Sequence, residues 1–222
     1  QRQMCIRDRV IGETITQGQR MLAEGVNPAL IENGAAFNGS PMGPLETLDT
    51  ISLETAYHGM QQRKADAKAA GQAWVPAPES EVIRYMVEDA KRLGQASGAG
   101  FYDYDENGKK TATWPGLKDA FAPDGYVDIP FEDVRDRLLF SQVLEAIRIM
   151  EEGVLTSVAD GNIGSIMGIG FPPHTGGVYQ CVNAYGVQAF ADRAQALAAR
   201  YGDAFEPPRL LLEMAAGNRC FA

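Results

Sequence analysis

Residues 11–26 read IGETITQGQRMLAEGV, and residues 139–154 read LFSQVLEAIRIMEEGV. Apolar or small residues stand at the same five places of both stretches, at a constant offset (139 − 11 = 154 − 26 = 128). Spacings of three and four residues put such side chains on one face of a helix. The chain is therefore predicted to hold an internal repeat whose copies each begin with a core-facing helix. The five places are Ile11, Ile15, Gly18, Leu22 and Val26 in the first copy, and Leu139, Val143, Ala146, Met150 and Val154 in the second.

Each predicted helix ends at a glycine and is followed by signals for a second helix. Gly25 and Gly153 can take the left-handed conformation that is common at helix C-termini. Asn27 can cap the next helix of the first copy, with Pro28 at its first position, and Thr156 or Ser157 can cap the corresponding helix of the second. Segments rich in proline and glycine, at 39–44 and 170–177, then end these helices, and further helices are predicted around 45–71 and 177–200.

The region between the copies is predicted to hold one more helix and a surface connection. Residues 79–93 have a helical apolar face, and Gly94 ends it. Residues 98–104, GAGFYDY, indicate a tight turn into a short extended segment. Residues 105–130, rich in Gly, Pro and Asp, are typical of a linker on the surface.

The predicted fold class is all-α, with two related helical subdomains. The first subdomain spans residues 10–104, the second spans 131–222, and 105–130 is the linker between them. Residues 1–9 start with Gln and join no periodic pattern, so they are interpreted as an artificial junction and not as native sequence.

Composition excludes several classes of function. A content of 45% hydrophobic residues in 222 is enough for a substantial core, and the net charge of −9 without a Lys/Arg cluster argues against nucleic-acid binding. An apolar run of about 18 residues, as a membrane span needs, is not found in the sequence. Cys5, Cys181 and Cys220 are too widely spaced to indicate a disulfide framework or a zinc site, so a cytoplasmic setting is predicted.

Several segments, taken in order, resemble one known family. A helix that ends in Glu-Gly, a second helix, the run Pro41-Met42-Gly43-Pro44-Leu45, then Asp49 and Leu53, and later GAGFYDY resemble the C-terminal domain of 3-hydroxyacyl-CoA dehydrogenases. The second copy looks like its duplicate. The pair, with GFPP at 170–173, resembles the multifunctional alpha subunit of bacterial fatty-acid β-oxidation complexes. The resemblance covers the chain from Val10 to about Phe221, with a departure at Ala96, where the family usually has Lys.

The resemblance implies a fragment of an NAD-dependent enzyme that oxidises 3-hydroxyacyl-CoA to 3-oxoacyl-CoA. In the family, a histidine paired with a carboxylate removes the hydroxyl proton, and these residues and the NAD site lie in a nucleotide-binding domain that has no counterpart in this sequence. The fragment, on the substrate and assembly side of the enzyme, is expected to be inactive alone, with no catalytic, cofactor-binding or metal-binding residues. Acyl-CoA is the implied ligand, upstream nucleotide-binding and enoyl-CoA hydratase domains are the implied partners, and a thiolase subunit is a further candidate.

Pro41, Met42, Gly43 and Pro44 are the predicted substrate-binding residues. Two prolines fix the backbone, and methionine offers an adaptable apolar surface that suits the wall of an acyl pocket. A plain helix terminator explains the same residues about equally well, and only the family resemblance favours binding.

The remaining candidate side chains are interpreted as structural. His58 and His174 lack carboxylate or cysteine partners at a suitable spacing, and Asp8, which falls where relatives have Asn or Ser before an arginine, lies in the junction segment. Aromatic residues of GAGFYDY are expected to be buried more than to stack an adenine. Four glycines fit no nucleotide-binding fingerprint and indicate close helix packing; they are Gly161, Gly164, Gly168 and Gly170.

An alternative function belongs to a different class. The chain could be a non-catalytic helical interaction module that pairs with a separately encoded catalytic chain. The DNA before Val10 separates the two hypotheses, because a continuing frame with Gly-x-Gly-x-x-Gly favours the enzyme fragment and a start site favours the module.

Overall fold

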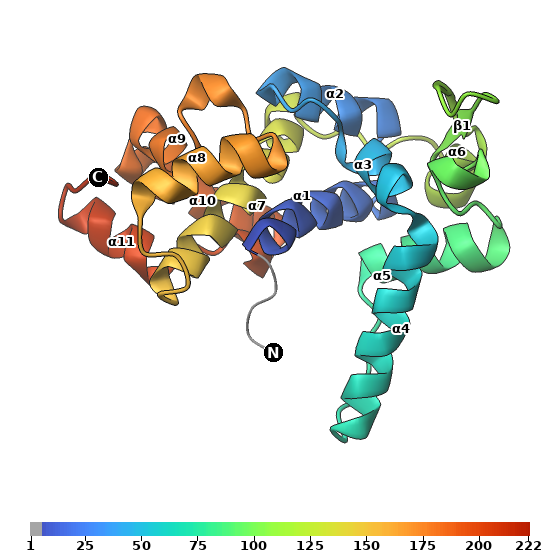
Figure 1. The fold of residues 1–222 in the computed structure, drawn as a ribbon, viewed down its shortest axis with the longest axis horizontal. Helices are drawn as coiled ribbons and strands as arrows, with labels where there is room; N and C mark the ends of the chain where they lie inside the picture. The colour runs from blue at the N-terminus through green and yellow to red at the C-terminus, as the bar shows by residue number, and fades with distance from the viewer. Residues whose placement is uncertain (1–5) are drawn as a thin grey trace. The chain divides into compact units, whose positions relative to one another are not determined.

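The computed structural model describes residues 6–222, and this part of the chain is built from α-helices with one small two-stranded sheet (Figure 1). The predicted all-α class is confirmed. The helices of the first half are α1 (Ile6–Ala23), α2 (Pro28–Asn38), α3 (Pro44–Ile51), α4 (Leu53–Ala69), α5 (Pro78–Arg84) and α6 (Gly116–Phe121). Those of the second half are α7 (Phe131–Glu151), α8 (Val158–Ile169), α9 (Val178–Tyr185), α10 (Val187–Tyr201) and α11 (Arg209–Ala216). The sheet pairs β1 (Tyr102–Tyr104) with β2 (Lys110–Thr113) in antiparallel orientation.

The chain forms two compact units, each assembled from separate stretches of sequence. Of the described residues, unit 1 contains 6–14, 34–41 and 130–222, and unit 2 contains 15–33 and 42–129. The division into subdomains 10–104 and 131–222 stays a prediction, because the units group residues by contact and not by the repeat.

Unit 1 is organised around α7, whose side chains are buried on nearly all sides. A helix whose side chains are apolar, or polar with hydrogen-bond partners, on every side is suited to the middle of a core. The rings of Phe140 and Phe190 stack face to face at 4.0 Å between centroids. The buried charge of Asp133 is satisfied by Arg193, Arg200 and Tyr201, so α7 and α10 are joined by ion pairs as well as by apolar contacts.

Unit 2 packs α3, α4 and α5 with the second half of α1 and the small sheet. Leucine and methionine side chains fill its interior, and Arg20 of α1 holds Glu79 of α5 through two hydrogen bonds of 3.0 and 3.2 Å. The best-buried core residues of this unit are Met21, Leu22, Val26, Ile31, Leu45, Leu53, Val82, Met86, Phe101 and Leu117.

The predicted helix ends and caps are confirmed in both copies. Gly25 and Gly153 have φ values of 84° and 71°, in the left-handed region. The Asn27 Oδ1 accepts from the N–H of Ala29 at 2.9 Å, and the Ser157 Oγ accepts from the N–H of Asp160 at 3.1 Å. Each copy therefore starts its second helix with a side-chain cap.

The two copies also agree at the break between their third and fourth helices. Ser52 separates α3 from α4 with φ 96° and ψ 122°, and Gly186 separates α9 from α10 with φ 92° and ψ 117°. Such backbone torsions are rare for residues with a side chain. Their recurrence at the same place in the helix order supports the duplication.

In the second copy the predicted apolar stripe is confirmed at Leu139, Val143, Ala146 and Met150 but not at Val154. Val154 is 43% exposed and follows the end of α7, and residues of α7 outside the stripe, such as Leu144 and Ile147, are fully buried. The stripe identified the helix correctly, but a helix enclosed on all sides has no single core face.

The predicted helix over 79–93 is shorter than expected. After α5 the backbone widens into a π-helical turn, Tyr85–Asp89, in which the Ala90 N–H donates to the carbonyl of Tyr85. Lys91, with φ 57°, then ends the helical course before Leu93. The predicted linker, residues 105–130, contains β2 and α6, and Leu117 of α6 is buried in unit 2.

Of the predicted junction, residues 1–5, including Cys5, lie outside the described residues. Residues 6–9 form the first turn of α1, and their interpretation as part of an artificial junction stays a prediction. Arg9 donates to Glu145 at 2.7 Å and to Glu152 at 2.7 and 3.0 Å, all within unit 1. Among residues 6–222, no helix combines the length and the apolar character that crossing a membrane requires.

Two glycines of α1 give a matched test of this packing. A Cβ added at Gly18 would lie 2.6 Å from the ring carbons of Pro44, whereas one at Gly12 would meet nothing within 4 Å. We expect Gly18→Ala to destabilise the protein by about 1–3 kcal/mol through overpacking, and Gly12→Ala to stabilise it by up to about 1 kcal/mol through helix propensity. Urea denaturation followed by circular dichroism measures both. Equal effects of the two substitutions would contradict the packing of α1 on Pro44.

Candidate functional site

The predicted substrate-binding segment, Pro41–Pro44, has an exposed half and a buried half. Pro41 is exposed and lies against Gly170 within unit 1. Met42 is 40% exposed, and its Sδ accepts a weak hydrogen bond from the Thr50 hydroxyl at 3.7 Å. Gly43 and Pro44 are buried at the start of α3, so they act as structural support and leave Pro41 and Met42 as the accessible surface.

A side chain from α2 caps the buried start of α3. Gly43 has no side chain with which to cap the helix, and the Glu32 Oε1 accepts from the N–H of Leu45 at 2.9 Å instead. A Cβ on Gly43 would overlap the carboxylate of Glu32. Glycine is needed here for space and not for a left-handed backbone, because its φ is −78°.

The other end of α3 anchors the GAGFYDY segment through Asp49. Its carboxylate accepts from the N–H groups of Phe101 and Tyr102, at 2.9 and 3.0 Å, and from the hydroxyl of Tyr104 at 2.9 Å. A Cβ on Gly100 would overlap this carboxylate, which explains the glycine of the segment. Arg92 completes the anchor by donating to the carbonyls of Gly100 and Tyr102.

Several ionisable groups of the same cluster have raised pKa values. Burial raises the pKa of Glu32 to about 7, although hydrogen bonds from Leu45 and Tyr102 act in the opposite direction. Burial also raises the pKa of Asp49 and the pKa values of the Tyr102 and Tyr104 hydroxyls. Lys110, which pairs with Glu46 and lies over the Tyr102 ring at 4.6 Å, partly offsets this negative charge.

This arrangement is better suited to holding a backbone than to chemistry. The Glu32 and Asp49 carboxylates are both engaged by backbone N–H groups, so they lack the freedom that a general acid or base needs. Within residues 6–222, no group of three or more His, Cys, Asp or Glu side chains could hold a metal ion. The cluster fixes the turn that presents Met42.

The remaining candidate residues lie apart from this cluster. The His58 side chain is 71% exposed, with Glu54 at 3.9 Å, and His174 is exposed beside Gly39. Asp8 is exposed and accepts from Arg7. As predicted, Phe101 and Tyr102 are buried, with 0% and 6% exposure.

Sequence reasoning missed Glu32, and the repeat held the signal that could have found it. In the second copy the Asn162 Oδ1 accepts from the N–H groups of Tyr179 and Gln180, at 2.9 and 3.1 Å, and so caps α9 as Glu32 caps α3. Extending the repeat comparison to the second helices would have aligned these two hydrogen-bond acceptors.

Comparison with known proteins finds one matching family model and two similar solved structures. Residues 6–104 match the family model described as 3-hydroxyacyl-CoA dehydrogenase, C-terminal domain. The structure is similar to a 3-hydroxybutyryl-CoA dehydrogenase from Escherichia coli K12, with a TM-score of 0.69 and 20% identity, over 95% of this chain and 59% of that chain. It is also similar to the dehydrogenase part of multifunctional enzyme 1 from C. elegans, with a TM-score of 0.63 and 18% identity, over 93% of this chain and 46% of that chain.

The fold is therefore similar to that of part of each of these two structures, and the chain spans about half the length of the solved structures it matches. The match to the family model, over residues 6–104, covers a little under half of the chain. The segments that carried the resemblance, Pro41–Leu45, Asp49 and Gly98–Tyr104, are those that the capping contacts of α3 bring together.

The raised pKa of Glu32 generates a prediction about stability and pH. A carboxyl group with a pKa of about 7 in the folded state and 4.5 unfolded binds more protons when folded, so its contribution is largest below pH 4.5 and is lost as the pH rises towards 7. Between pH 4.5 and 7 this group is expected to lower the free energy of unfolding by on the order of 3 kcal/mol. We expect Glu32→Gln, which keeps an acceptor for the Leu45 N–H, to remove this decrease. Unfolding by urea from pH 4.5 to 8 measures the difference.

The control is Glu106→Gln, which removes one negative charge at an exposed position. It should leave the slope of stability against pH unchanged. A slope that Glu32→Gln does not alter would show that this carboxyl is not protonated by burial.

Proposed function

We propose that the chain is the substrate-side and assembly-side part of an NAD-dependent 3-hydroxyacyl-CoA dehydrogenase, which oxidises 3-hydroxyacyl-CoA to 3-oxoacyl-CoA. The match of residues 6–104 to the C-terminal domain family carries this proposal. The rigidly held Pro41–Pro44 turn supports it, because a wall of a substrate pocket has to keep its shape when the pocket is empty.

The redox chemistry is assigned to a nucleotide-binding domain outside this sequence. NAD would supply the hydride acceptor there, and this chain is expected to hold no cofactor itself. The acidic residues of the Glu32–Asp49 cluster are occupied by helix and turn capping, which is consistent with a role in shaping the substrate side.

The parent enzyme is further proposed to be multifunctional, with an enoyl-CoA hydratase domain and a cytoplasmic role in fatty-acid β-oxidation, and a thiolase subunit is a candidate partner. The name of the C. elegans relative, the dehydrogenase part of a multifunctional enzyme, supports this reading. So does the repetition of the helix order α1–α4 in α7–α10, because a tandem pair of such domains resembles the multifunctional alpha subunit.

Within the substrate side, Pro41 and Met42 are proposed to contact the acyl chain, with Gly43 and Pro44 holding the backbone behind them. A partly exposed methionine on a fixed turn offers a polarizable apolar surface to a flexible aliphatic substrate. The buried capping contact from Glu32 keeps this turn in place without using either exposed side chain.

Two experiments test the assignment. Purified residues 1–222, incubated with 3-hydroxybutyryl-CoA and NAD, are expected to show no rise in absorbance at 340 nm. Turnover would contradict the assignment of the redox chemistry to a separate domain. The genomic DNA before Val10 is expected to continue in frame into a Gly-x-Gly-x-x-Gly segment. A start site there would favour the alternative, an interaction module that pairs with a separate catalytic chain.

A substitution in the full-length enzyme tests the substrate-binding segment. Met42→Ala removes apolar surface from the proposed acyl wall, and we expect kcat/KM for an acyl-CoA substrate to fall about tenfold, or about 1.4 kcal/mol, with little change in melting temperature. Met167→Ala, at a methionine with 82% exposure on α8, is the matched control and should leave kcat/KM unchanged. Equal activity of both variants would identify Pro41–Pro44 as a helix terminator only.

A further inference from the structure

The chain contains three Asn-Gly pairs, and in such a pair the asparagine side chain can react with its own main chain. They are Asn33-Gly34, Asn38-Gly39 and Asn107-Gly108. The main-chain nitrogen of the glycine can attack the side-chain carbonyl carbon of the asparagine, because glycine has no Cβ to hinder the approach. The reaction requires that these two atoms meet, so the surroundings of each pair decide whether it reacts.

The two pairs of α2 are held in place. Asn33 and Gly34 lie within the helix, which fixes the peptide between them, and a Cβ at Gly34 would already be 2.9 Å from Val134. The buried Asn38 carboxamide donates to the carbonyl of Arg135 at 2.8 Å and accepts from the Arg135 Nε at 3.2 Å. Neither side chain can turn onto its glycine unless this part of α2 unfolds.

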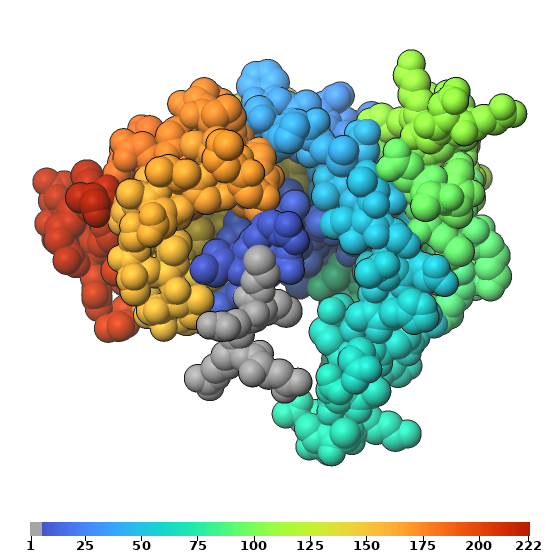
Figure 2. All heavy atoms as spheres, in the orientation of Figure 1, coloured from blue at the N-terminus to red at the C-terminus, as the bar shows by residue number. Residues whose placement is uncertain are grey.

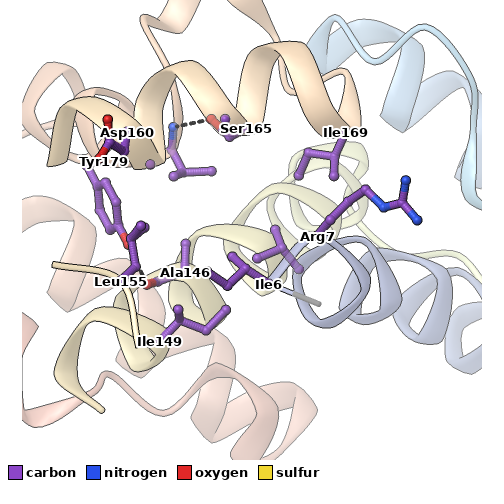
Figure 3. Close-up of a pocket in the computed structure, with 13 residues that line it drawn as sticks. Ile6, Arg7, Ala146, Ile149, Leu155, Asp160, Ser165, Ile169 and Tyr179 are labelled. Atoms are coloured by element: carbon purple, nitrogen blue, oxygen red, sulfur yellow. Dashed lines mark hydrogen bonds between the residues drawn. The ribbon is translucent and has the colours of Figure 1, made fainter. Parts of the chain in front are cut away.

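Polar side chains on the wall of a cavity in unit 1 are restrained in a similar way (Figure 3). The Ser165 hydroxyl accepts from the N–H of Val178 at 3.2 Å, as the dashed line shows, and the Tyr179 hydroxyl donates to the carbonyl of Ala146 at 2.7 Å. These hydrogen bonds leave the two hydroxyl groups little freedom to react.

The third pair, Asn107-Gly108, lies in the exposed turn between β1 and β2, a frequent place for Asn-Gly. The carbonyl of Asp105 accepts from the N–H of Gly108 at 2.9 Å. Its Oδ1 accepts from the N–H groups of Asn107 and Lys109, both at 2.9 Å. The Asn107 carboxamide is exposed and has no hydrogen-bond partner among the described residues. The carbon that would react is therefore free to move, and only the turn restrains the nitrogen of Gly108.

This turn can open without unfolding of unit 2. Besides Asp105, it is held by Gln95, whose Nε2 donates to the carbonyl of Gly108 at 2.8 Å. Strand β2 is exposed along most of its length, and a two-stranded hairpin is only marginally stable by itself. Opening of such a segment costs much less free energy than global unfolding. The Gly108 nitrogen is thus released from Asp105 while the rest of the unit stays folded.

From this contrast we propose that Asn107 is a site of spontaneous deamidation. In the opened turn the main-chain nitrogen of Gly108 loses its proton and forms a bond with the Asn107 Cγ. The bond between Cγ and the side-chain nitrogen breaks, and ammonia leaves. The product is a cyclic succinimide, which one water molecule opens to aspartate or to isoaspartate. The reaction consumes water, releases ammonia and needs no oxidant, reductant or cofactor.

Deamidation changes the turn in two ways. Both products place a new carboxylate beside Asp105, and isoaspartate also lengthens the main chain by one carbon. The longer turn cannot keep Gly108 bonded to Asp105 and Gln95 at the same time. The same hairpin carries Lys110, which pairs with Glu46 of α3, so isoaspartate is expected to loosen this contact as well.

The test incubates purified residues 1–222 at mildly alkaline pH and follows each asparagine by peptide mapping and mass spectrometry. Deamidation is expected to accumulate at Asn107 about tenfold faster than at Asn33 and Asn38, which serve as controls in the same molecule. The rate at Asn107 should increase with pH, because the attacking nitrogen has to lose its proton. A rate at Asn107 no higher than at the other two overturns the proposal.

The restraint on the turn is tested by substitution. Gln95→Ala removes the hydrogen bond to the Gly108 carbonyl and is expected to raise the rate at Asn107 several-fold. Gln188→Ala removes an exposed glutamine that donates to Asp192 at 2.8 Å in unit 1, and it should leave the rate unchanged. A rate that Gln95→Ala does not raise overturns the role given to this hydrogen bond.

The effect on the hairpin is tested by hydrogen exchange. The isoaspartate form, separated by ion exchange, is compared with Asn107→Asp, which adds the charge without lengthening the main chain. The N–H groups of Gly108 and Lys109 are expected to exchange several-fold faster in the isoaspartate form, because they lose Asp105 as acceptor. Equal exchange in the two proteins overturns the loosening of the turn.

Discussion

The first N–H groups of a helix have no partner inside the helix, and when that end is buried another part of the chain has to supply one. Both copies of the repeat meet this constraint at their third helix. In unit 2 Glu32 supplies the acceptor to α3, and in unit 1 Asn162 supplies it to α9. Much of the surrounding sequence follows from this, because the acceptor needs a glycine in front of the helix and a fixed second helix behind it.

Local signals were sufficient to predict the helices but not these contacts. Gly25, Asn27 and Ser157 act within a few residues of themselves, and their roles could be read from the sequence. The cap from Glu32 to Leu45 joins two helices, and the anchor from Asp49 to Phe101 joins residues far apart in the chain. Such partners depend on how the helices pack, and the sequence pattern showed only that glycines stood at the places where they meet. The π-helical turn after α5 and the order in residues 110–121 were missed for the same reason, since both depend on packing in unit 2.

The short segment Pro41–Pro44 both stabilises the start of α3 and exposes side chains at the surface. Gly43 and Pro44 are buried against Glu32 and Gly18, so the backbone that carries Met42 is fixed from behind. This explains why the two interpretations of Pro41–Pro44, a helix terminator and a binding surface, could not be separated by residue type. The segment serves as the terminator through its buried half, and its exposed half remains accessible to a ligand. In Figure 2 the light-blue stretch of the chain, which includes this turn, lies at the surface.

Helices α4 and α5 pack against each other as a hairpin. Ser52, between α3 and α4, determines how this hairpin is attached to the rest of unit 2. Ser52 occupies a backbone conformation that costs roughly 1–3 kcal/mol for a residue with a side chain. The structure holds it there because the carbonyl of Leu93 accepts from the N–H of Leu53 at 3.0 Å and from the Ser52 hydroxyl at 3.3 Å. The α3–α4 junction that carries the hairpin is thus a hydrogen-bonded, stiff turn and not a flexible loop. A force applied to the far end of α4 would therefore be transmitted to α3, because the junction between α3 and α4 does not bend easily.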